Sequence, residues 1–459
     1  MEAQQIADIV ARQRALFATH RTFDIDYRKA ALDRLYRAVR IHEREIADAL
    51  KSDLGKSLDE SYMCEIGLSL SEIRYQIAHV KRWSRSRLRG AGLANSISVG
   101  RVTPVPYGVT LIMAPWNYPF LLTLEPLAGA IAAGNCCVLK SSNYSPAPSA
   151  VLKKICEECF PSELVSVVEG GRAENTALLD QTWDYIFFTG SPTVGKLVME
   201  RASEHLTPVS LELGGKSPCI IERTADLRVA AARVAFGKWL NVGQTCVAPD
   251  YVLVDRAVHD EFLELLKRQV RKMYGADPLA NPDYGKMINR KHFDRVCGLI
   301  DPAKVVLGGE TDEETLRIAP TIMDGATATD AVMGEEIFGP VLPALTYDSL
   351  EAAERFISER PTPLALYLFT RDHAVEDRIM RFVPFGGGCV NDTIIHLSTP
   401  TMGFGGMGNS GMGAYHGKKS FDTFSHEKSI VKKLNHPDLP MRYQPYAPWK
   451  QKLVRLFLR

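Results

Sequence analysis

Residues 184–196 read DYIFFTGSPTVGK. The apolar first half predicts a short buried strand, and the glycines and proline of the second half predict a tight turn that opens a helix. The backbone N–H groups of such a turn can face an anionic phosphate, and the helix dipole adds to the attraction. This segment therefore predicts an α/β unit with a candidate phosphate-binding turn.

The same order of strand and helix occurs earlier in the chain. Apolar strand patterns occur at VTLIMA (109–114), CCVLK (136–140) and VSVVEG (165–170), and helical patterns follow the last two. Short apolar strands that alternate with helices favour an open parallel sheet with helices on both faces. A second alternating region begins near Glu212 and runs to about residue 415. The sequence therefore predicts an α/β fold throughout.

Residues 1–87 are helical in pattern. One helix is predicted through residues 26–50, with an apolar face formed by Ala30, Leu32, Leu35, Ala38 and Val39. We expect Gly55 to end this helix, and Ser57 with Glu60 to form a capping box for the next.

Composition bounds the class of protein. The chain has 459 residues, of which 46% are hydrophobic and 24% charged, which is typical of globular proteins. Lysine and arginine (55) balance aspartate and glutamate (54), so no basic excess indicates a nucleic-acid partner. No apolar run approaches the roughly 18–20 residues of a membrane span. Nine cysteines, an odd number, predict free thiols and, with no signal-peptide core, a cytoplasmic protein.

The glycine turn alone does not identify a ligand. Gly190, Gly195 and Lys196 match the spacing of a nucleoside-triphosphate loop, but Leu197 stands where a serine or threonine would hold Mg²⁺. The usual dinucleotide pattern G-x-G-x-x-G is also missing. A purely structural turn therefore stays open as the alternative.

Three residues elsewhere have neighbours that suit catalysis. Cys246 lies among small and polar residues, where an exposed thiol could act as a nucleophile. Glu212 lies beside paired glycines that let water or substrate approach closely, and Asn117 lies on a rigid turn between two prolines that could aim its amide at an oxyanion. The alternatives are an inert buried thiol, a paired carboxylate and an asparagine that bonds its own turn.

Together, these motifs resemble the aldehyde dehydrogenase superfamily. The matching motifs are APWNYPF (114–120), GSPTVGK (190–196), LELGGKSP (211–218), GQTCVAPDY (243–251) and EEIFGPVLP (335–343). The short N-terminus, VNDTIIH (390–396) and FGGMGNSGMGAYHGKKSFDTFSH (404–426) resemble the class 3 branch, the fatty and aromatic aldehyde dehydrogenases. The resemblance runs from about residue 1 to about residue 445. Because all five motifs occur in the family's order, a purely structural role for each of them at once is improbable.

The resemblance implies a covalent mechanism. Cys246 would attack the aldehyde, Asn117 and the backbone N–H of Cys246 would hold the oxyanion, and Glu212 would activate the water that hydrolyses the thioester. The product would be a carboxylic acid. The resemblance implies no metal site.

The resemblance also implies cofactor contacts at Trp116, Lys140, Asn143, Gly190, Ser191, Gly195, Leu213, Glu336 and Phe338. Lys140 would bind the adenosine ribose, and Glu336 would bind the nicotinamide ribose. Where family members commonly read Lys-Pro-Ser-Glu, this chain reads Lys-Ser-Ser-Asn through Asn143. The missing carboxylate would not repel the 2′-phosphate of NADP, so we expect use of both NAD and NADP.

Tyr118 and Phe404 match positions near the family's substrate tunnel. Neither is a cationic anchor, and aromatic walls suit medium or long aliphatic, or aromatic, aldehydes. The alternative is that both rings are ordinary core residues. His396 is expected to be structural.

The expected fold is a Rossmann-like cofactor domain, an α/β catalytic domain and a small β arm for oligomerisation. The expected boundaries are residues 1–83 and 106–211 for NAD(P) binding, 212–415 for catalysis, 84–105 and 416–437 for the arm, and 438–459 for a C-terminal extension. Class 3 members are usually dimers, so a homodimer is expected. In the extension, helical spacing groups four apolar residues together: Trp449, Leu453, Leu456 and Phe457. The basic residues lie largely elsewhere on the helix: Lys450, Lys452, Arg455 and Arg459. This leaves weak contact with an anionic membrane surface open.

Three rival functions remain at the level of sequence. A cysteine hydrolase or amidase could use Cys246, Glu212 and Lys216, but the glycine turn and EEIFGP would then have no task. A CoA-acylating dehydrogenase is disfavoured because that branch generally lacks the base at Glu212. A nucleotide-binding module without enzymatic activity is disfavoured by Leu197.

Overall fold

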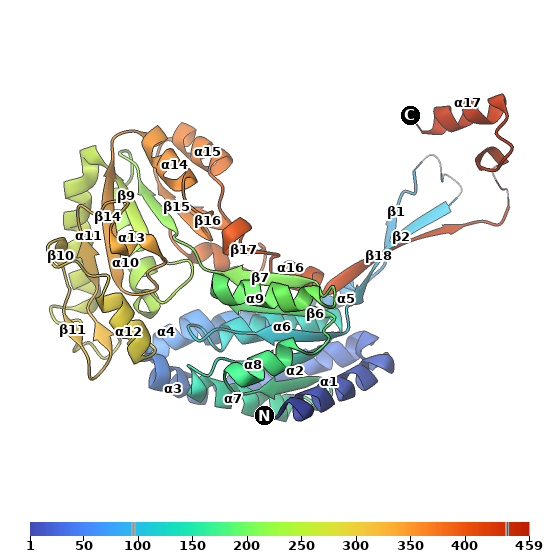
Figure 1. Cartoon of the computed structure of the whole chain (residues 1–459), viewed down its shortest axis with the longest axis horizontal. Helices are drawn as coiled ribbons and strands as arrows, with labels where there is room; N and C mark the ends of the chain where they lie inside the picture. Colours follow the sequence, from blue (N-terminus) through green and yellow to red (C-terminus); the bar gives the residue numbers. More distant parts are fainter. Residues whose placement is uncertain (93–94, 96–97, 437, 439, 459) are drawn as a thin grey trace.

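The computed structural model describes residues 1–92, 95, 98–436, 438 and 440–458. Part of the predicted arm (residues 93–94, 96–97 and 437) and Arg459 lie outside the described residues. The described chain forms two α/β lobes, with a thin arm that projects from the lobe containing the N-terminus (Figure 1).

The first lobe contains a six-stranded sheet with the order β17-β7-β6-β3-β4-β5. Its strands are β3 (Val109–Met113), β4 (Cys136–Lys140), β5 (Val165–Val168), β6 (Tyr185–Gly190), β7 (Val209–Leu213) and β17 (Gly411–Met412). All pairs are parallel except β17 with β7. The predicted parallel sheet is confirmed. Its central strands are almost wholly buried, which explains their unbroken apolar runs.

Helices cover both faces of this sheet (Figure 1). They are α1 (Ala3–Ala18), α2 (Ile25–Ile41), α3 (Glu43–Leu54), α4 (Leu58–Ser61), α5 (Gly67–Trp83), α6 (Leu121–Ala133), α7 (Pro146–Cys159), α8 (Arg172–Leu179), α9 (Pro192–Ser203) and α16 (Lys418–Thr423). All residues of α6 are buried, so it forms the centre of the helical layer. A π-helical turn, Tyr62–Ile66, joins α4 to α5.

The prediction of a single helix through residues 26–50 is wrong, because the structure has two helices there, α2 and α3. The helix is interrupted at His42, whose imidazole lies 2.8 Å from carboxylate oxygens of both Glu45 and Glu158. Glu158 belongs to α7, against which α3 packs, so a contact distant in sequence redirects the chain. Ala30, predicted on the apolar face, is exposed, and its neighbour Ala31 is buried instead.

The second lobe contains a seven-stranded sheet with the order β10-β13-β14-β9-β8-β15-β16. Its strands are β8 (Pro218–Ile221), β9 (Tyr251–Asp255), β10 (Val305–Leu307), β13 (Thr321–Met323), β14 (Val341–Tyr347), β15 (Ala365–Phe369) and β16 (Gly387–Val390). Its helices are α10 (Leu227–Trp239), α11 (His259–Tyr274), α12 (Arg290–Cys297), α13 (Ala331–Gly334), α14 (Leu350–Ser358) and α15 (His373–Phe382). A small two-stranded sheet pairs β11 (Thr311–Asp312) with β12 (Arg317–Ile318).

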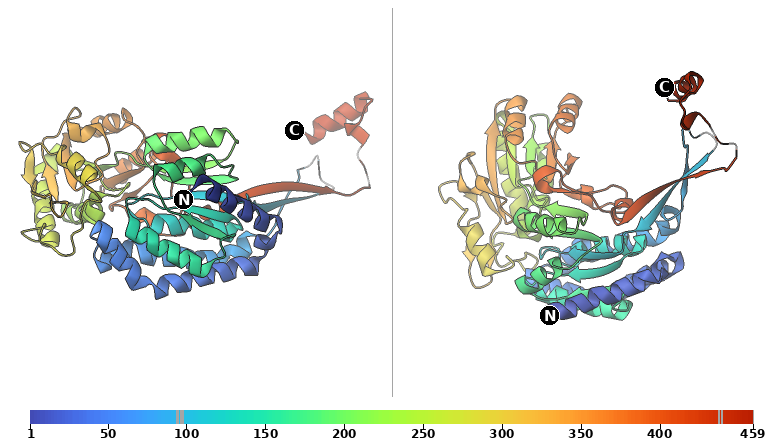
Figure 2. Two further views of the ribbon diagram at one scale, coloured as in Figure 1. Left: turned by 60° about the horizontal axis from the view of Figure 1, so that its bottom comes forward. Right: turned by 45° about the vertical axis from the view of Figure 1, so that its right-hand side comes forward.

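The arm is an antiparallel sheet of β1 (Arg87–Arg89), β2 (Ser98–Pro106) and β18 (Ser425–Lys433). β18 pairs with β2 from Ser425 opposite Pro106 to Lys433 opposite Ser98. Helix α17 (Pro448–Phe457) lies beyond the arm, away from both lobes (Figure 2). In the part of the chain that the structure describes, no helix is both long and apolar enough to cross a membrane.

Candidate active site

Cys246 follows α10 through a strained turn. Asn241 (φ 50°), Val242 (φ 56°) and Gly243 (φ 72°) are consecutive residues in the left-handed region. This conformation is costly for a β-branched valine, and such strain clusters at functional sites. A Cβ on Gly243 would lie 2.2 Å from the carbonyl oxygen of Gly339, so only glycine fits there.

A carboxylate from α4 helps to hold this turn. The backbone N–H of Asn241 donates to Glu60 Oε1 over 2.9 Å. Ser57 Oγ caps the helix as predicted by accepting from the Glu60 N–H, but the Glu60 side chain does not complete the capping box. Its carboxylate instead ties the first lobe to the segment that leads to Cys246.

The thiol of Cys246 is protonated in this environment. Burial, together with the carboxylates of Glu336 and Glu212, raises its pKa to about 12, although the backbone N–H groups of Cys246 and Val247 favour the thiolate. The nucleophile therefore needs a base to remove its proton.

Asn117 lies beside this segment. Its side-chain Nδ2 donates to the backbone carbonyl oxygen of Gln244 over 3.0 Å. The backbone carbonyl oxygen of Asn117 accepts from Asn241 Nδ2 over 2.8 Å. An amide nitrogen carries two hydrogens, so one remains available to a ligand. The structure thus brings the predicted amide donor to the backbone two residues before Cys246.

Lys56 and Glu65 support this turn, although sequence reasoning missed both. They form a fully buried ion pair. Lys56 Nζ donates to the Asn117 carbonyl over 2.9 Å, and Glu65 Oε2 accepts from the N–H groups of Phe120 (2.9 Å) and Leu121 (3.2 Å). Glu65 lies in the π-helical turn, a feature often found at functional sites. No local sequence pattern identifies the pair.

Glu212 lies near the end of β7, opposite Gly411 of β17. It is buried, and neither carboxylate oxygen has a hydrogen-bond partner in the protein. Burial raises its pKa well above the ordinary value. A buried carboxyl group with free oxygens is typical of a general base.

Glu336 approaches the chain just beyond Glu212. A Cβ on Gly214 would lie 1.9 Å from Glu336 Oε2, so glycine makes room for this carboxylate. Burial raises the pKa of Glu336 to about 8, and the charge of Asp250 adds to the effect. Its Oε1 has no protein partner.

Lys216 holds the loop that carries Glu336. Its Nζ donates to the carbonyl oxygens of Val332 (2.9 Å) and Glu335 (2.8 Å) and pairs with Asp250. Asp250 also accepts from the Ile337 N–H over 3.0 Å. With its ammonium group occupied in this way, Lys216 is a structural residue and not part of a hydrolase triad.

The predicted phosphate turn opens α9. Ser191 caps this helix by accepting from the Val194 N–H over 3.4 Å. A Cβ on Gly195 would lie 2.7 Å from Leu213 Cδ2, so glycine lets α9 pack closely against β7. A Cβ on Gly190 would lie 2.5 Å from the ring of Phe188. The helix terminus is therefore set directly against the strand that bears Glu212.

Lys140 ends β4, and Asn143 lies in the turn that follows. Burial lowers the pKa of Lys140 to about 8, and its ammonium group donates to the Ser141 carbonyl. Asn143 is exposed, and its amide nitrogen would lie 3.6 Å from a Cβ on Gly171. Gly171 precedes α8, so the amide faces the start of another helix.

An aromatic cluster joins the two lobes near these residues. The Trp116 ring lies 5.4 Å from the Phe338 ring in a T-shaped pair and 4.9 Å from the His292 ring. His292, from α12, was not singled out by sequence. Burial lowers its pKa to about 4, and its Nδ1 has no protein partner.

The two predicted substrate contacts lie in different surroundings. The Tyr118 hydroxyl group lies 2.6 Å from the Oγ1 atom of Thr245, the residue before Cys246. Lys56 Nζ lies over the Tyr118 ring, 4.0 Å from the ring centroid. Phe404 packs against the rings of Tyr415, His416 and His396.

Among the residues described, no group of three or more histidine, cysteine, aspartate or glutamate side chains is arranged to hold a metal ion.

Comparison with known proteins supports one family. A model of the aldehyde dehydrogenase family matches residues 1–430. The 4,4'-diaponeurosporen-aldehyde dehydrogenase of Staphylococcus aureus is 45% identical over 448 residues, which cover 97% of each chain. The dimeric, NADP-preferring aldehyde dehydrogenase of Rattus norvegicus is 43% identical over 442 residues, which cover 96% of this chain and 98% of that one.

A solved structure agrees with these relatives. The substrate-bound state of Staphylococcus aureus AldH matches with a TM-score of 0.97 at 44% identity, and the match covers 99% of both chains. The fold predicted from sequence is therefore confirmed. The chain belongs to the aldehyde dehydrogenase family and is an NAD(P)-dependent enzyme that oxidises aldehydes.

Proposed function

We propose that Cys246 attacks the aldehyde carbon, while the Asn117 amide and the Cys246 backbone N–H hold the oxygen that becomes negative. The observation that carries this proposal is the 3.0 Å hydrogen bond from Asn117 Nδ2 to the Gln244 carbonyl, which fixes the amide beside the nucleophile's backbone. One preorganised donor of this kind is worth roughly 3–4 kcal/mol of the barrier.

Glu212 is the base in this proposal. The Cys246 thiol, with its pKa of about 12, must lose its proton before it attacks. Glu212 has two oxygens free of protein partners, and its raised pKa makes it a stronger base than an exposed carboxylate. It accepts the thiol proton first, releases that proton to solvent before hydrolysis, and then accepts a proton from the hydrolytic water.

The residues of this chain fit a dinucleotide. Glu336 Oε1 lacks a protein partner and can accept from a ribose hydroxyl group. Ser191 lies at the start of α9, where unpaired N–H groups suit a pyrophosphate. Lys140, Asn143, Gly190, Gly195 and Leu213 complete this side, and Trp116 and Phe338 flank the nicotinamide side. A bound NAD(P) would supply the oxidant for the carbon attached to Cys246.

Hydrolysis completes the reaction. Water that has lost a proton to Glu212 adds to the thioester carbon, the carbon–sulfur bond breaks, and the carboxylic acid leaves. The presence of Glu212 favours water over coenzyme A as the acceptor of the acyl group.

For the substrate we propose medium- or long-chain aliphatic, or aromatic, aldehydes. The aromatic rings of Tyr118 and Phe404 favour apolar chains. Asn143 supports the use of NADP as well as NAD, because a neutral amide does not repel a 2′-phosphate. The NADP-preferring rat relative points in the same direction.

The structure suggests a task for each part of the chain. We propose the six-stranded lobe (1–83 and 106–211) as the cofactor-binding domain, residues 212–415 as the catalytic domain, residues 84–105 and 416–437 as a dimerisation arm, and residues 438–459 as an extension. The exposed strand β18 supports a homodimer, as in the dimeric rat relative. Sedimentation at micromolar concentration should give twice the mass of the chain, and a stable monomer would refute the dimer.

Two further assignments concern location. Free thiols at all nine cysteines support a cytoplasmic protein. Helix α17 exposes Trp449 (51%) and Leu456 (64%) beside basic residues, which supports weak contact with anionic lipid. Flotation with anionic vesicles should be lost when residues 447–459 are removed, and unchanged flotation would refute the contact.

The test of the catalytic proposal is an aldehyde panel with NAD and NADP, followed at 340 nm, with Cys246→Ala as the blank. Mass spectrometry after rapid quenching should locate an acyl group on Cys246. An adduct on another residue, or turnover by Cys246→Ala, would overturn the assignment.

A further inference from the structure

Three buried side chains, those of Glu212, Glu125 and His416, have polar atoms without a hydrogen-bond partner in the protein. The atoms are Oε1 and Oε2 of Glu212, Oε2 of Glu125 and Nε2 of His416. Glu125 and His416 are 3% and 4% exposed, so both are almost wholly buried. Buried polar atoms in folded proteins are nearly always satisfied, and where protein groups do not serve, ordered water does.

The chain itself connects these groups. Gly411 pairs with Glu212 across β17 and β7, and residues 411–416 lead from there to His416. His416 Nε2 lies 3.7 Å from Glu125 Oε2, a gap that one proton or one water can bridge. One short segment therefore leads from the strand partner of Glu212 to the Glu125–His416 pair.

Tyr415 lies between the two ends. Its ring contacts the His416 ring in a tilted arrangement, with centroids 4.2 Å apart and an interplanar angle of 36°. Burial raises its pKa, and the charges of Glu125, Glu212 and Cys246 each raise it further. The same phenol group therefore lies within electrostatic range of both carboxylates and of the nucleophile.

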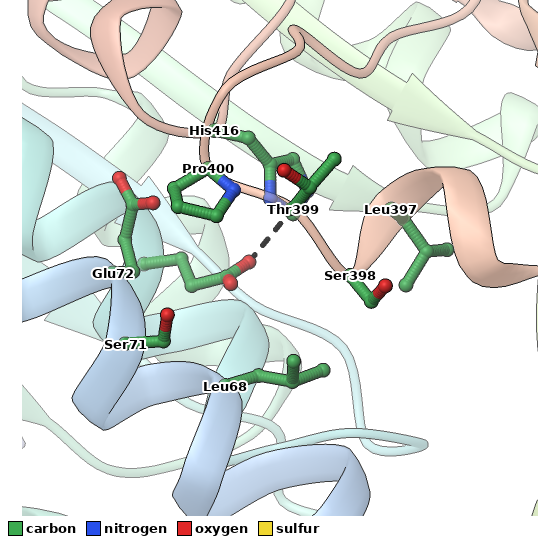
Figure 3. A pocket seen from close by; sticks show the side chains of 9 residues that line it. Leu68, Ser71, Glu72, Leu397, Ser398, Thr399, Pro400 and His416 are labelled. Carbon is green, nitrogen blue, oxygen red and sulfur yellow. Dashed lines mark ion pairs between the residues drawn. The ribbon is translucent and has the colours of Figure 1, made fainter. Parts of the chain in front are cut away.

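The pair opens toward the surface. A small cavity of about 10 Å³, the space of one water molecule, is lined by Glu125, His416, Glu72 and residues 397–400. Figure 3 shows Glu72 and Ser71 of α5 on one side of it, and Ser398 and His416 on the other. Ser398 is exposed, so the cavity lies next to solvent.

Glu72 has a different environment from that of Glu125. Its oxygens accept from the Gly417 N–H over 2.9 and 3.0 Å, and one accepts from Gln76 Nε2 over 2.7 Å. Gly417 is in the left-handed region (φ 52°), and a Cβ there would lie 1.7 Å from the Pro400 carbonyl. Glu72 therefore anchors a tight turn through three accepted hydrogen bonds.

We propose that Glu125 and His416 form the path by which the proton taken up by Glu212 during hydrolysis leaves the site. The proposal rests on the proposed function of Cys246 and Glu212. In this step a water O–H bond breaks, its oxygen adds to the thioester carbon, and its proton goes to Glu212. The carbon–sulfur bond breaks, the sulfur leaves as the thiolate of Cys246, and this thiolate regains a proton from solvent to restore the resting thiol.

The proton then passes through water to the Glu125–His416 pair, which releases a proton into the cavity. Glu212 returns to its ionised form. Burial raises the pKa of Glu125 and lowers that of His416 to about 3, so the resting pair holds its proton on the carboxyl group, facing a neutral imidazole. Glu125 and His416 touch no reacting atom, so they act through Glu212 as positioning residues.

The test separates acylation from hydrolysis. With enzyme in excess over a single aliphatic aldehyde, the appearance of NAD(P)H reports acylation, and quenched samples analysed by mass spectrometry report loss of the acyl group from Cys246. In Glu125→Gln we expect acylation within twofold of the wild type, hydrolysis slower by at least tenfold, and a larger solvent deuterium effect on hydrolysis. Glu125→Asp should restore part of the rate.

Glu222→Gln is the matched control, because it makes the same change at a buried carboxylate of the second lobe. It should lower the melting temperature without altering the ratio of hydrolysis to acylation. His416→Gln is the second variant if Glu125→Gln does not fold, and it should also slow hydrolysis selectively. Hydrolysis within twofold of wild type in Glu125→Gln, or in its substitute His416→Gln, overturns the proposal. Failure of the wild type to acylate Cys246 at all would instead overturn the proposed function.

Discussion

The ammonium group of Lys56 donates a hydrogen bond to the backbone carbonyl of Asn117 over 2.9 Å, from a position with no exposure to solvent. Its partner Glu65 accepts from the N–H groups of Phe120, which precedes α6, and Leu121, which begins it. The two charges therefore hold the turn that carries the oxyanion donor. A buried ion pair gains little net stability, because removing both charges from water is costly. The contribution of Lys56 and Glu65 is therefore to hold the Asn117 turn in position.

Replacement of Lys56 by methionine should remove this support. Leaving Glu65 buried and unpaired should cost about 3–5 kcal/mol of unfolding free energy. Because the Asn117 turn loosens, kcat should fall more than KM rises. Denaturant unfolding and steady-state kinetics measure both. Lys51→Met, at an exposed lysine of α3, is the control, and equal behaviour of the two variants would contradict the role of Lys56.

Glu212→Gln should separate the two halves of the reaction. Loss of a general base slows proton transfer by roughly 10²–10⁴-fold, so the thioester should accumulate on Cys246 after NAD(P)H has formed. Because Glu212 also accepts the thiol proton in the proposed mechanism, the first phase should slow as well. Stopped-flow absorbance with mass spectrometry measures both phases. Glu222→Gln, a buried carboxylate of the second lobe, is the control. Hydrolysis at the wild-type rate in Glu212→Gln would exclude it as the base.

Asn143→Glu should reduce the use of NADP. A carboxylate about 4 Å from a 2′-phosphate is repelled by roughly 1–4 kcal/mol, which corresponds to a fall in kcat/KM for NADP of about fivefold to nearly a thousandfold. The value for NAD should fall much less. Asn143→Gln keeps the side chain neutral and should leave the ratio of NAD to NADP unchanged. A wild-type enzyme inactive with NADP would refute the premise.

His396→Gln should make the protein less sensitive to acid. Burial lowers the pKa of His396 to about 4, so between about pH 6.5 and pH 4 the unfolded chain binds a proton that the folded chain does not. The stability due to the neutral ring is therefore present above pH 6.5 and is lost as the pH falls.

At pH 5 this loss amounts to about 2 kcal/mol at most. Unfolding free energies at pH 7.5 and pH 5 should therefore differ less in the variant than in the wild type. His373→Gln, at a side chain that is 95% exposed, should behave like the wild type. Equal acid sensitivity in His396→Gln and the wild type would contradict the prediction.

Much of the architecture was predictable from local pattern. The apolar runs of β3, β4 and β6 and the turn after Thr189 predict a parallel sheet, because a strand buried on both faces needs apolar residues throughout. The break at His42 was not predictable, since the contact with Glu158 depends on how α3 packs against α7.

The sequence alone determined the order of strands and helices and the identity of Cys246, Glu212 and Asn117 as candidates, because hydrophobic period, turn chemistry and motif spacing are properties of neighbouring residues. Only the tertiary structure decided which side chains surround them. Lys56 with Glu65, and Glu125 with His416, come from segments far apart in the chain. Their effects, and the pKa of the Cys246 thiol, depend on burial and on charges across space, which no local pattern encodes.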